Sequence, residues 1–428
     1  MPFLQNKPAI LFVTPVLGHP PKGGPELRIE NSIKALSKIA TVTLYCRISC
    51  VQIGGDSAIK YLRNFVEGIH FAPFFQRQNG FFSLLPRLIN LFFRILLRRN
   101  LIALPVEGEA DYQDVVRTAE SLGADAIWLG YGNISYPLLK YIKACSNIPV
   151  VVDTDSVWSR FVLRGCPFAK DENERKMIEA KGKAKEQEER WGTRLADVTT
   201  AVSVVDAEYY RGLTDDPARV HIFPNVIDLN TYKIISPPNR FTKPCIYLAG
   251  SFWPDSPMED SARWMLKLVL PILKREVPDV HFYIVGRGST QVLADVGDTN
   301  VTITGELPSV LPYLTNATVA VIPLRFESGT RFKILEAGAC GIPVVSTTLG
   351  TEGIPTTNGR DILIADTPED FAHAIIRVIH DRELAESLGL NLKDLVTNGY
   401  SIAALASEGQ EILHFLLDHD FESINADK

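Results

Sequence analysis

The stretch that decides the fold is residues 319–353, VAVIPLRFESGTRFKILEAGACGIPVVSTTLGTEG. It reads as a buried apolar strand, a turn that contains glycine, a helix, a second apolar strand and a second glycine turn. Strands that alternate with helices in this way are typical of βαβ units, whose strands run parallel. The stretch therefore predicts a parallel sheet with ligand-binding turns at the carboxyl ends of its strands.

The same alternation runs through nearly the whole chain and is interrupted once. Residues 236–244, SPPNRFTKP, are rich in proline and polar residues and suit a linker. We expect strands at 9–14, 41–46, 68–71, 126–129, 149–153, 198–203 and 220–223 before the linker, and at 245–249, 280–285, 301–304, 319–323, 343–347 and 362–365 after it. The fold class is therefore α/β, with an N-terminal domain over 1–236, a C-terminal domain over 245–398, and a final helix over 399–428 that packs back on the first domain.

Composition excludes several other classes of protein. The 428 residues are 46% hydrophobic and 22% charged, which suits about two domains of an ordinary α/β protein. A net charge of -6 provides no broad basic surface, so we expect no nucleic acid as a partner. The six cysteines form no C-x-x-C pair and the start has no secretory leader pattern, so we expect reduced thiols in a cytoplasmic protein.

Several residues of the deciding stretch suit a bound diphosphate. Gly329 and Thr330 follow a strand and open a helix, so free backbone N–H groups and the positive end of the helix dipole point at one place. Arg331 and Lys333 add cationic side chains. Glu336 lies further along the helix between apolar neighbours, where a carboxylate needs a hydroxyl or cationic partner such as a ribose diol. The alternative is that these side chains form weak surface ion pairs on an ordinary amphipathic helix.

Residues 329–353 resemble the donor-binding segment of the family-four retaining glycosyltransferases of GT-B fold. They match the pattern G-T-R-x-K-x-L-E-A-x-A-x-G-x-P-V-V-S-T-x-x-G-x-E-G of one subgroup. Other pieces follow in the family's order, among them KGGPELRIENSIKALSK, ADVTTAVSVVDAEYY, FPNVIDLNTY, YLAGSFWPDSP and FYIVGRGS. The resemblance covers about residues 8 to 400, and it implies two facing Rossmann-like domains with an interdomain cleft.

The resemblance also implies a role for each donor-site residue. Glu336 would hold the donor ribose, while the backbone from Gly329 to Phe332, with Arg331 or Lys333, would hold the diphosphate. Further donor-binding residues would be Gly24 from the N-terminal domain and Gly250, Ser251 and Arg287 from the C-terminal domain. For the glycine turns, the alternative is that tight backbone geometry alone requires the glycines.

The chain departs from the family at the expected catalytic positions. Many members carry two glutamates eight positions apart, and eight positions before Glu336 stands Ser328, so Glu327 either replaces the missing contact or faces solvent. Asp155 stands where related sequences often have a histidine. We take Glu327 and Asp155 as the candidate catalytic residues, which would orient sugar hydroxyls or accept the acceptor's proton. Asp153 and Asp155 also imitate a metal-binding acid pair, but the domain order fits the metal-free architecture, and we expect neither a metal nor another cofactor.

The segment Phe81–Asn100, FFSLLPRLINLFFRILLRRN, holds four arginines and no acid among apolar residues. One interpretation is that it lies on the inner, anionic face of a membrane and brings the active site to a lipid-linked acceptor. The other is a helix that packs on the core and exposes a basic rim.

The sequence and the resemblance together predict a metal-free glycosyltransferase of hexosyl type, and the resemblance implies retention of configuration. The enzyme would move a sugar from a nucleotide-diphosphate sugar to a glycan, lipid-linked or small-molecule acceptor in glycoconjugate or polysaccharide synthesis. A non-catalytic nucleotide-sugar binding subunit, a nucleotide-sugar epimerase and a phosphorylase remain alternatives. A binding subunit would not turn over the donor. An epimerase would interconvert the free nucleotide sugar without an acceptor, and a phosphorylase would require phosphate.

Overall fold

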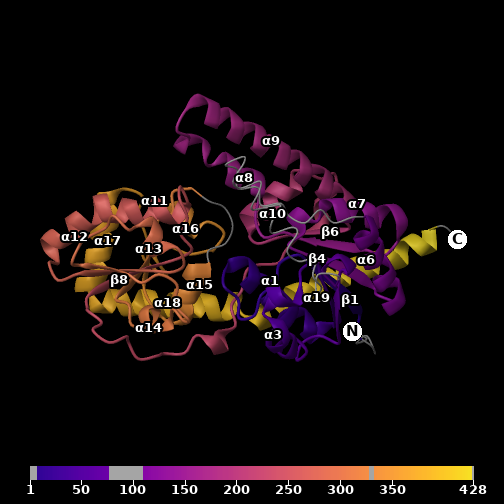
Figure 1. Ribbon diagram of the computed structural model, residues 1–428, viewed down its shortest axis with the longest axis horizontal. Helices are drawn as coiled ribbons and strands as arrows, with labels where there is room; N and C mark the ends of the chain where they lie inside the picture. The colour runs from indigo at the N-terminus through magenta and orange to yellow at the C-terminus, as the bar shows by residue number, and fades with distance from the viewer. Residues whose placement is uncertain (1–6, 77–108, 327–331, 427–428) are drawn as a thin grey trace.

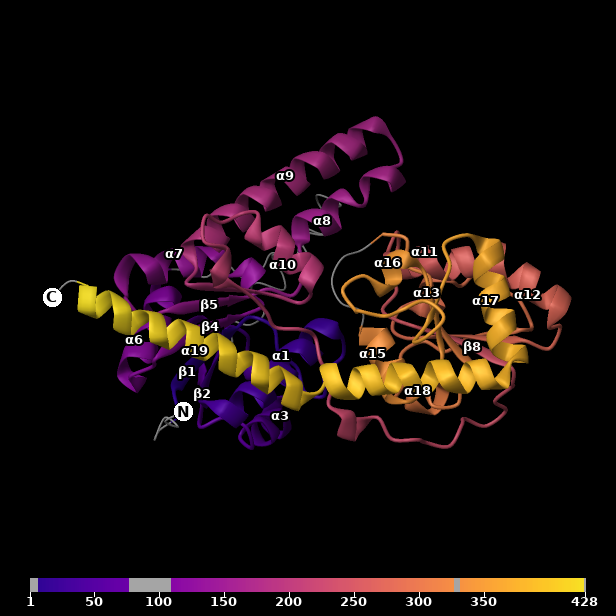
Figure 2. The ribbon, with the colours of Figure 1, turned by 180° about the vertical axis from the view of Figure 1, so that it is seen from behind.

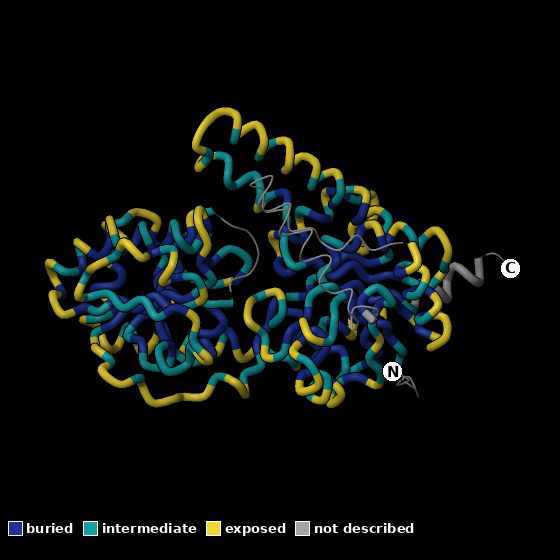
Figure 3. The backbone as a smooth tube through the Cα atoms, in the orientation of Figure 1, coloured by how far each residue is buried: buried dark blue, intermediate teal, exposed yellow. Residues whose placement is uncertain are grey.

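The chain forms two parallel sheets, one before the linker and one after it. The computed structural model describes residues 7–76, 109–326 and 332–426, with side chains described as far as 417. Its two α/β domains lie side by side along the long axis (Figure 1). The strands are the most buried part of each domain (Figure 3). The predicted α/β class with two parallel sheets is confirmed.

The N-terminal sheet has seven parallel strands in the order β3-β2-β1-β4-β5-β6-β7. They are β1 (Ala9–Thr14), β2 (Thr41–Cys46), β3 (Gly68–Phe71), β4 (Ala126–Gly130), β5 (Val150–Asp153), β6 (Val198–Ala201) and β7 (Val220–Ile222). The strand order reverses between β1 and β4, which is where open parallel sheets of this type place their ligands.

The C-terminal sheet has six parallel strands in the order β10-β9-β8-β11-β12-β13. They are β8 (Cys245–Ala249), β9 (His281–Val285), β10 (Val301–Ile303), β11 (Val319–Ile322), β12 (Val344–Ser346) and β13 (Leu363–Ile364). Here the order reverses between β8 and β11, so the loops after these two strands are the matching ligand-binding position.

Helices connect the strands and cover both sheets. In the N-terminal half they are α1 (Gly24–Ile39), α2 (Cys50–Ile53), α3 (Gly55–Leu62), α4 (Pro73–Gln76), α6 (Glu109–Leu122), α7 (Tyr136–Cys145), α8 (Trp158–Leu163), α9 (Glu172–Leu195) and α10 (Val204–Arg211). In the C-terminal half they are α11 (Pro257–Trp264), α12 (Leu270–Glu276), α13 (Ser289–Val292), α14 (Leu311–Leu314), α15 (Phe332–Ala339), α16 (Thr348–Thr351), α17 (Pro368–His380), α18 (Arg382–Gly399) and α19 (Ile402–Ala426).

The last helix returns to the first domain. Figure 2 shows α18 under the C-terminal domain and α19 along the N-terminal domain, almost in one line. Leu405, Ile412 and Leu416 of α19 belong to the same buried cluster as Leu36 and Phe223. The chain thus passes between the domains twice, and the two passages touch where the amide of Ile227 donates to the carbonyl of Tyr400 at 3.1 Å.

Helices α8 and α9 form a projecting hairpin, which we call the arm, residues 158–195 (Figures 1 and 2). The Asp171 carboxylate caps α9 by accepting from the amide of Glu174. Gly182 lets the two helices approach closely, since a Cβ there would lie 2.4 Å from a methyl carbon of Leu163. At the base of the arm the buried Glu189 accepts from the amide and hydroxyl of Ser159. These contacts join the two helices into one element.

None of the helices within the described ranges is long and apolar enough to span a bilayer. The basic apolar segment Phe81–Asn100 lies outside those ranges, so its predicted membrane contact stays a prediction.

Candidate functional site

The amino ends of α1 and α15 meet between the two domains. Gly24 opens α1, and a Cβ at Gly24 would lie 3.2 Å from the ring of Phe332, the first residue of α15. Leu27, one turn further into α1, packs on the hydrophobic cluster that includes α15. The amino ends of two helices, which carry the positive ends of the helix dipoles, therefore lie together at the carboxyl edges of the sheets. Gly24 thus lies beside the start of α15, and its predicted contact with a donor stays a prediction.

Helix α15 carries a buried carboxylate whose two oxygens both have partners. Glu336 is 8% exposed. Its Oε2 accepts from Nζ of Lys333 at 2.7 Å, and its Oε1 accepts from the hydroxyl of Tyr232 at 3.2 Å. Burial and the neighbouring Glu336 carboxylate raise the pKa of Tyr232 far above its usual range. The ion pair that the sequence offered as an alternative thus forms between Lys333 and Glu336, but its carboxylate is buried.

The sequence did not point to Tyr232 as a site residue. It follows a short helical turn at Leu229–Thr231 in the stretch between the last strand of the first sheet and the first strand of the second. Only its place at the end of the motif FPNVIDLNTY could have drawn attention to it.

The glycine turns of the C-terminal domain are packed backbone against backbone. Gly286 has φ 134°, and a Cβ there would lie 1.9 Å from the carbonyl oxygen of Gly250. The amide of Gly250 donates to the carbonyl of Val285 at 3.0 Å. Tight geometry is therefore sufficient reason for these glycines. Ser251 is partly buried and Arg287 is exposed at the tip of the turn, at the carboxyl edge where a ligand is expected.

Asp155 follows β5 at the carboxyl edge of the N-terminal sheet. Its Oδ1 accepts from Nε1 of Trp158 at 3.0 Å, and its amide donates to Oδ1 of Asn133 at 3.1 Å. Burial raises the pKa of Asp155 to about 6, although Trp158, Arg28 and Tyr131 oppose the shift. Tyr131 itself has φ 63°, a left-handed conformation that is strained for a residue with a side chain. A carboxyl with this pKa can take up or release a proton near neutral pH.

Asp153, in contrast, is fully occupied by structural partners. The guanidinium of Arg28 and the hydroxyl of Thr200 donate to its Oδ1, the latter at 2.8 Å, and Nε1 of Trp128 donates to Oδ2 at 3.3 Å. The Asp153 side chain is completely buried. Asp153 and Asp155 thus have different environments. Although their spacing resembles a metal-binding acid pair, both oxygens of Asp153 accept hydrogen bonds from protein side chains. In the part of the chain that the structure describes, no three His, Cys, Asp or Glu side chains gather as a metal site.

The arm reaches across to the C-terminal domain beside the site. Arg164 donates to Oε1 of Glu352 at 2.7 Å, and the rings of Phe168 and Phe326 lie 4.5 Å apart. A cavity of about 590 Å³ lies under the arm between these two aromatic rings and helix α11. Phe326 directly precedes the segment 327–331, so the arm contacts the residue from which the predicted donor loop starts.

Four predicted site residues lie outside the described residues: Glu327, Gly329, Thr330 and Arg331. Their predicted contacts with donor sugar and diphosphate stay predictions.

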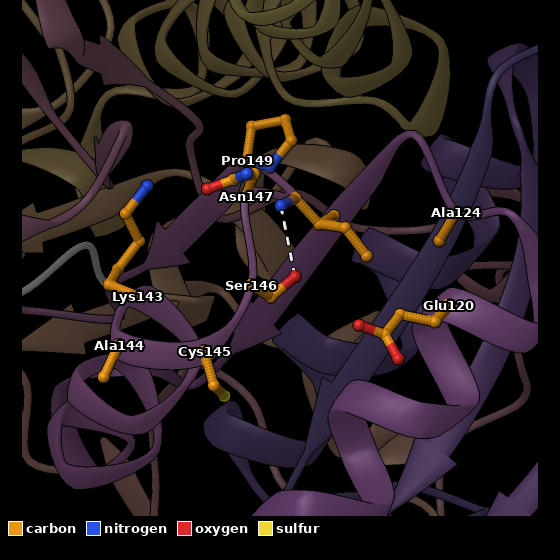
Figure 4. Close-up of a pocket in the computed structure, with 9 residues that line it drawn as sticks. Glu120, Ala124, Lys143, Ala144, Cys145, Ser146, Asn147 and Pro149 are labelled. Atoms are coloured by element: carbon orange, nitrogen blue, oxygen red, sulfur yellow. Dashed lines mark hydrogen bonds between the residues drawn. The ribbon is translucent and has the colours of Figure 1, made fainter.

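A second hollow, of about 600 Å³, lies elsewhere on the N-terminal domain (Figure 4). Its lining includes Ala124, two residues before β4, and Pro149, directly before β5. It is therefore at the amino ends of the strands, the opposite edge from the site. Its one lysine, Lys143, is paired with Asp197 at 2.9 Å, and we assign it no ligand.

Comparisons with known proteins find a family match within the second domain and a structural likeness over the whole chain. Residues 243–381 match the family described as Glycosyl transferases group 1. No curated protein sequence matches the chain.

Solved structures match the chain over nearly its full length. HepE of Anabaena, in complex with UDP and glucose, has a TM-score of 0.60 at 16% identity, over 95% of this chain and 99% of that chain. Sucrose-phosphate synthase of Thermosynechococcus elongatus has a TM-score of 0.63 at 17% identity, over 99% of this chain and 100% of that one. A mutant of S. aureus TarM, in complex with fondaparinux, alpha-GlcNAc-glycerol and UDP, has a TM-score of 0.61 at 13% identity, over 95% and 99%. At these identities the likeness establishes the GT-B fold that the sequence predicted.

Proposed function

We propose that the protein transfers a sugar from a nucleotide-diphosphate sugar, held by the C-terminal domain, to an acceptor held against the N-terminal domain. The observation that carries this proposal is the pair Lys333–Glu336 on α15. It places a cation and a buried carboxylate at the domain boundary, within the segment that matches group 1 glycosyltransferases. The bound UDP and sugars named for HepE and TarM support a donor of this chemical class.

The donor would lie across the amino end of α15. Its ribose diol would bind the carboxylate of Glu336, and its diphosphate would bind Lys333 together with the predicted donors Gly329, Thr330 and Arg331. Breaking the bond between the anomeric carbon and phosphate leaves negative charge on the diphosphate. Helix N–H groups and the cations Lys333 and Arg331 would stabilise that charge, which is why we propose a reaction without a metal ion.

The acceptor side would use Asp155. Because burial raises its pKa to about 6, this carboxyl is ionised at neutral pH yet basic enough to accept a proton from an attacking hydroxyl. Glu327 would orient the donor sugar. We propose retention of configuration and a hexose donor from the resemblance to retaining enzymes, with a glycan, a lipid-linked sugar or a small molecule as acceptor in glycoconjugate or polysaccharide synthesis.

The arm would keep water out of the site. Its contacts through Arg164 and Phe168 hold the N-terminal domain against the C-terminal domain. A donor enclosed between the two domains is protected from hydrolysis, because water cannot replace the acceptor at the anomeric carbon.

Donor binding and hydrolysis test the proposal. The purified protein is screened against a panel of nucleotide sugars by thermal shift and by release of nucleoside diphosphate, with and without EDTA. Stabilisation by one nucleotide sugar, with slow release that EDTA does not affect, is expected for the wild type and lost in Glu336→Ala.

Glu276→Ala, an exposed acid of the same domain, is the control and should behave as the wild type. Binding that requires a divalent ion would contradict the metal-free reaction, and failure to bind any nucleotide sugar would contradict the donor site. Interconversion of the donor without an acceptor would identify an epimerase instead.

A further inference from the structure

Tyr232 joins the stretch between the domains to the donor site. It is partly buried and packs on the hydrophobic cluster that includes Leu335 of α15. Its hydroxyl donates to Oε1 of Glu336 at 3.2 Å. Neither its position in the chain nor the family match, which begins at residue 243, assigns it a role.

The two partners of Glu336 differ in how firmly they are held. The side chain of Lys333 is 34% exposed and flexible, so it can leave Oε2 for a phosphate that carries more charge. The ring of Tyr232 is fixed by its packing. A carboxylate with one oxygen held by a fixed donor keeps its plane when the other oxygen changes partners, and each carboxylate oxygen can accept from more than one donor.

We propose that Tyr232 is a positioning residue of the donor site, which fixes the Glu336 carboxylate for the ribose hydroxyls while Lys333 exchanges from Glu336 to the diphosphate. This inference rests on the proposed function and adds to it the residue that orients the ribose contact. Bidentate binding of a diol requires the carboxylate plane to be aligned before the nucleotide arrives, so the fixed donor lowers the entropic cost of binding.

The same stretch is also tied to the N-terminal domain. Four residues before Tyr232, Oδ2 of Asp228 accepts from Nζ of Lys34 at 3.1 Å, and Lys34 is also paired with Glu30 at 2.9 Å. Residues 228–232 are therefore bound at one end to α1 and at the other end to α15. In this proposal the Glu336 carboxylate that binds the ribose is therefore hydrogen-bonded to a segment that contacts both domains.

Binding of ribose and deoxyribose nucleotides to Tyr232→Phe tests the inference. The probes are UDP, GDP and ADP, and the 2′,3′-dideoxy form of the one that binds the full-length wild type best, measured by calorimetry. In Tyr232→Phe we expect about tenfold weaker binding of the ribose nucleotide, the size of one hydrogen bond to a charged group, and unchanged binding of the dideoxy nucleotide.

Tyr247→Phe is the matched control. Tyr247 lies in the same cluster, burial and then the Glu336 carboxylate raise its pKa, and among the described residues its buried hydroxyl has no hydrogen-bond partner. It should bind both nucleotides as the wild type does. An equal loss for both nucleotides in Tyr232→Phe, or no loss, would overturn the inference while leaving the donor site in place. If the wild type binds none of the three diphosphates, the proposed function fails, and this inference with it.

Lys333→Met tests the exchange of partners. We expect about tenfold weaker binding of the nucleoside diphosphate and unchanged binding of the corresponding nucleoside, because Lys333 contacts only the phosphates once the nucleotide is bound. If Lys333→Met also bound the nucleoside more weakly, Lys333 would remain paired with Glu336 in the complex, and the proposed exchange of Lys333 from Glu336 to the diphosphate would be refuted.

Discussion

Asp155 is predicted to make the N-terminal domain less stable as the pH rises through 6. Burial of its carboxyl raises the pKa from 3.8 to about 6 in the folded protein. A folded-state pKa above the unfolded value means that the stabilising contribution is complete below pH 3.8 and is lost as the pH rises through about 6. Near pH 8 the folded protein therefore carries the full cost of a buried, ionised carboxylate.

The size of the effect follows from the shift of about two units. Each unit corresponds to about 1.4 kcal/mol, so the cost at pH 8 is at most about 3 kcal/mol. Asp155→Asn keeps the shape and removes the charge. We expect this variant to be more stable than the wild type by up to about 3 kcal/mol at pH 8, with a difference that shrinks as the pH falls towards 4.

Urea denaturation between pH 4.5 and 8, followed by circular dichroism, measures this difference. Asp215→Asn is the control, because the side chain of Asp215 is 93% exposed on the same domain and its removal should give no pH-dependent change. A difference between Asp155→Asn and wild type that is constant with pH would refute the reasoning, since only a titrating group changes its contribution.

The same substitution should reduce activity. If Asp155 accepts the acceptor's proton, Asp155→Asn lowers kcat/KM by about 100-fold and removes the rise in rate near pH 6. A gain in stability together with a loss of activity is the expected result at a site where a charge is buried for function. An unchanged pH profile would assign the proton to another group.

Three further predictions concern the frame around the site. Gly286→Ala should destabilise the C-terminal domain by about 3 kcal/mol or more, measured by urea denaturation, because its Cβ would lie 1.9 Å from a carbonyl oxygen; an effect below about 1 kcal/mol would contradict the packing. Arg28→Leu should cost about 3–5 kcal/mol in the same assay, because it leaves Asp153 buried without a cation, and adding Asp153→Asn should restore part of the loss. Phe168→Ala should remove about 1 kcal/mol of contact with Phe326 and raise KM for the donor several-fold, whereas Phe168→Leu should have a smaller effect.

The positions of the strands could be predicted because the signal is local. β1 was predicted at the residues where it is found, Ala9–Thr14, as an apolar run between turn residues. Predicted ends differ where a neighbouring element competes. The strand expected over 198–203 stops at Ala201, since the Ser203 side chain accepts from the amide of Asp206 and caps α10. The strand expected from Pro149 begins at Val150, since proline has no N–H to donate.

The site could be predicted only in part, because its contacts join distant residues. Lys333 and Glu336 are three residues apart on a helix, and the sequence indicated their proximity. Tyr232 reaches Glu336 from 104 residues away, and no local pattern encodes how the chain between the domains crosses α15. The raised pKa of Asp155 likewise depends on what covers it, which only the packed structure determines.

The return of α19 to the first domain reverses the order in which the protein can be completed during synthesis. Residues 1–236 leave the ribosome before the C-terminal domain, yet their hydrophobic cluster includes Leu405, Ile412 and Leu416, which are made after that domain. The C-terminal domain is continuous from Cys245 to Gly399 and can fold as soon as it has emerged. The domain that is translated first is thus finished second, and a chain that stops before Ile402 would leave an apolar face of α1 open to aggregation.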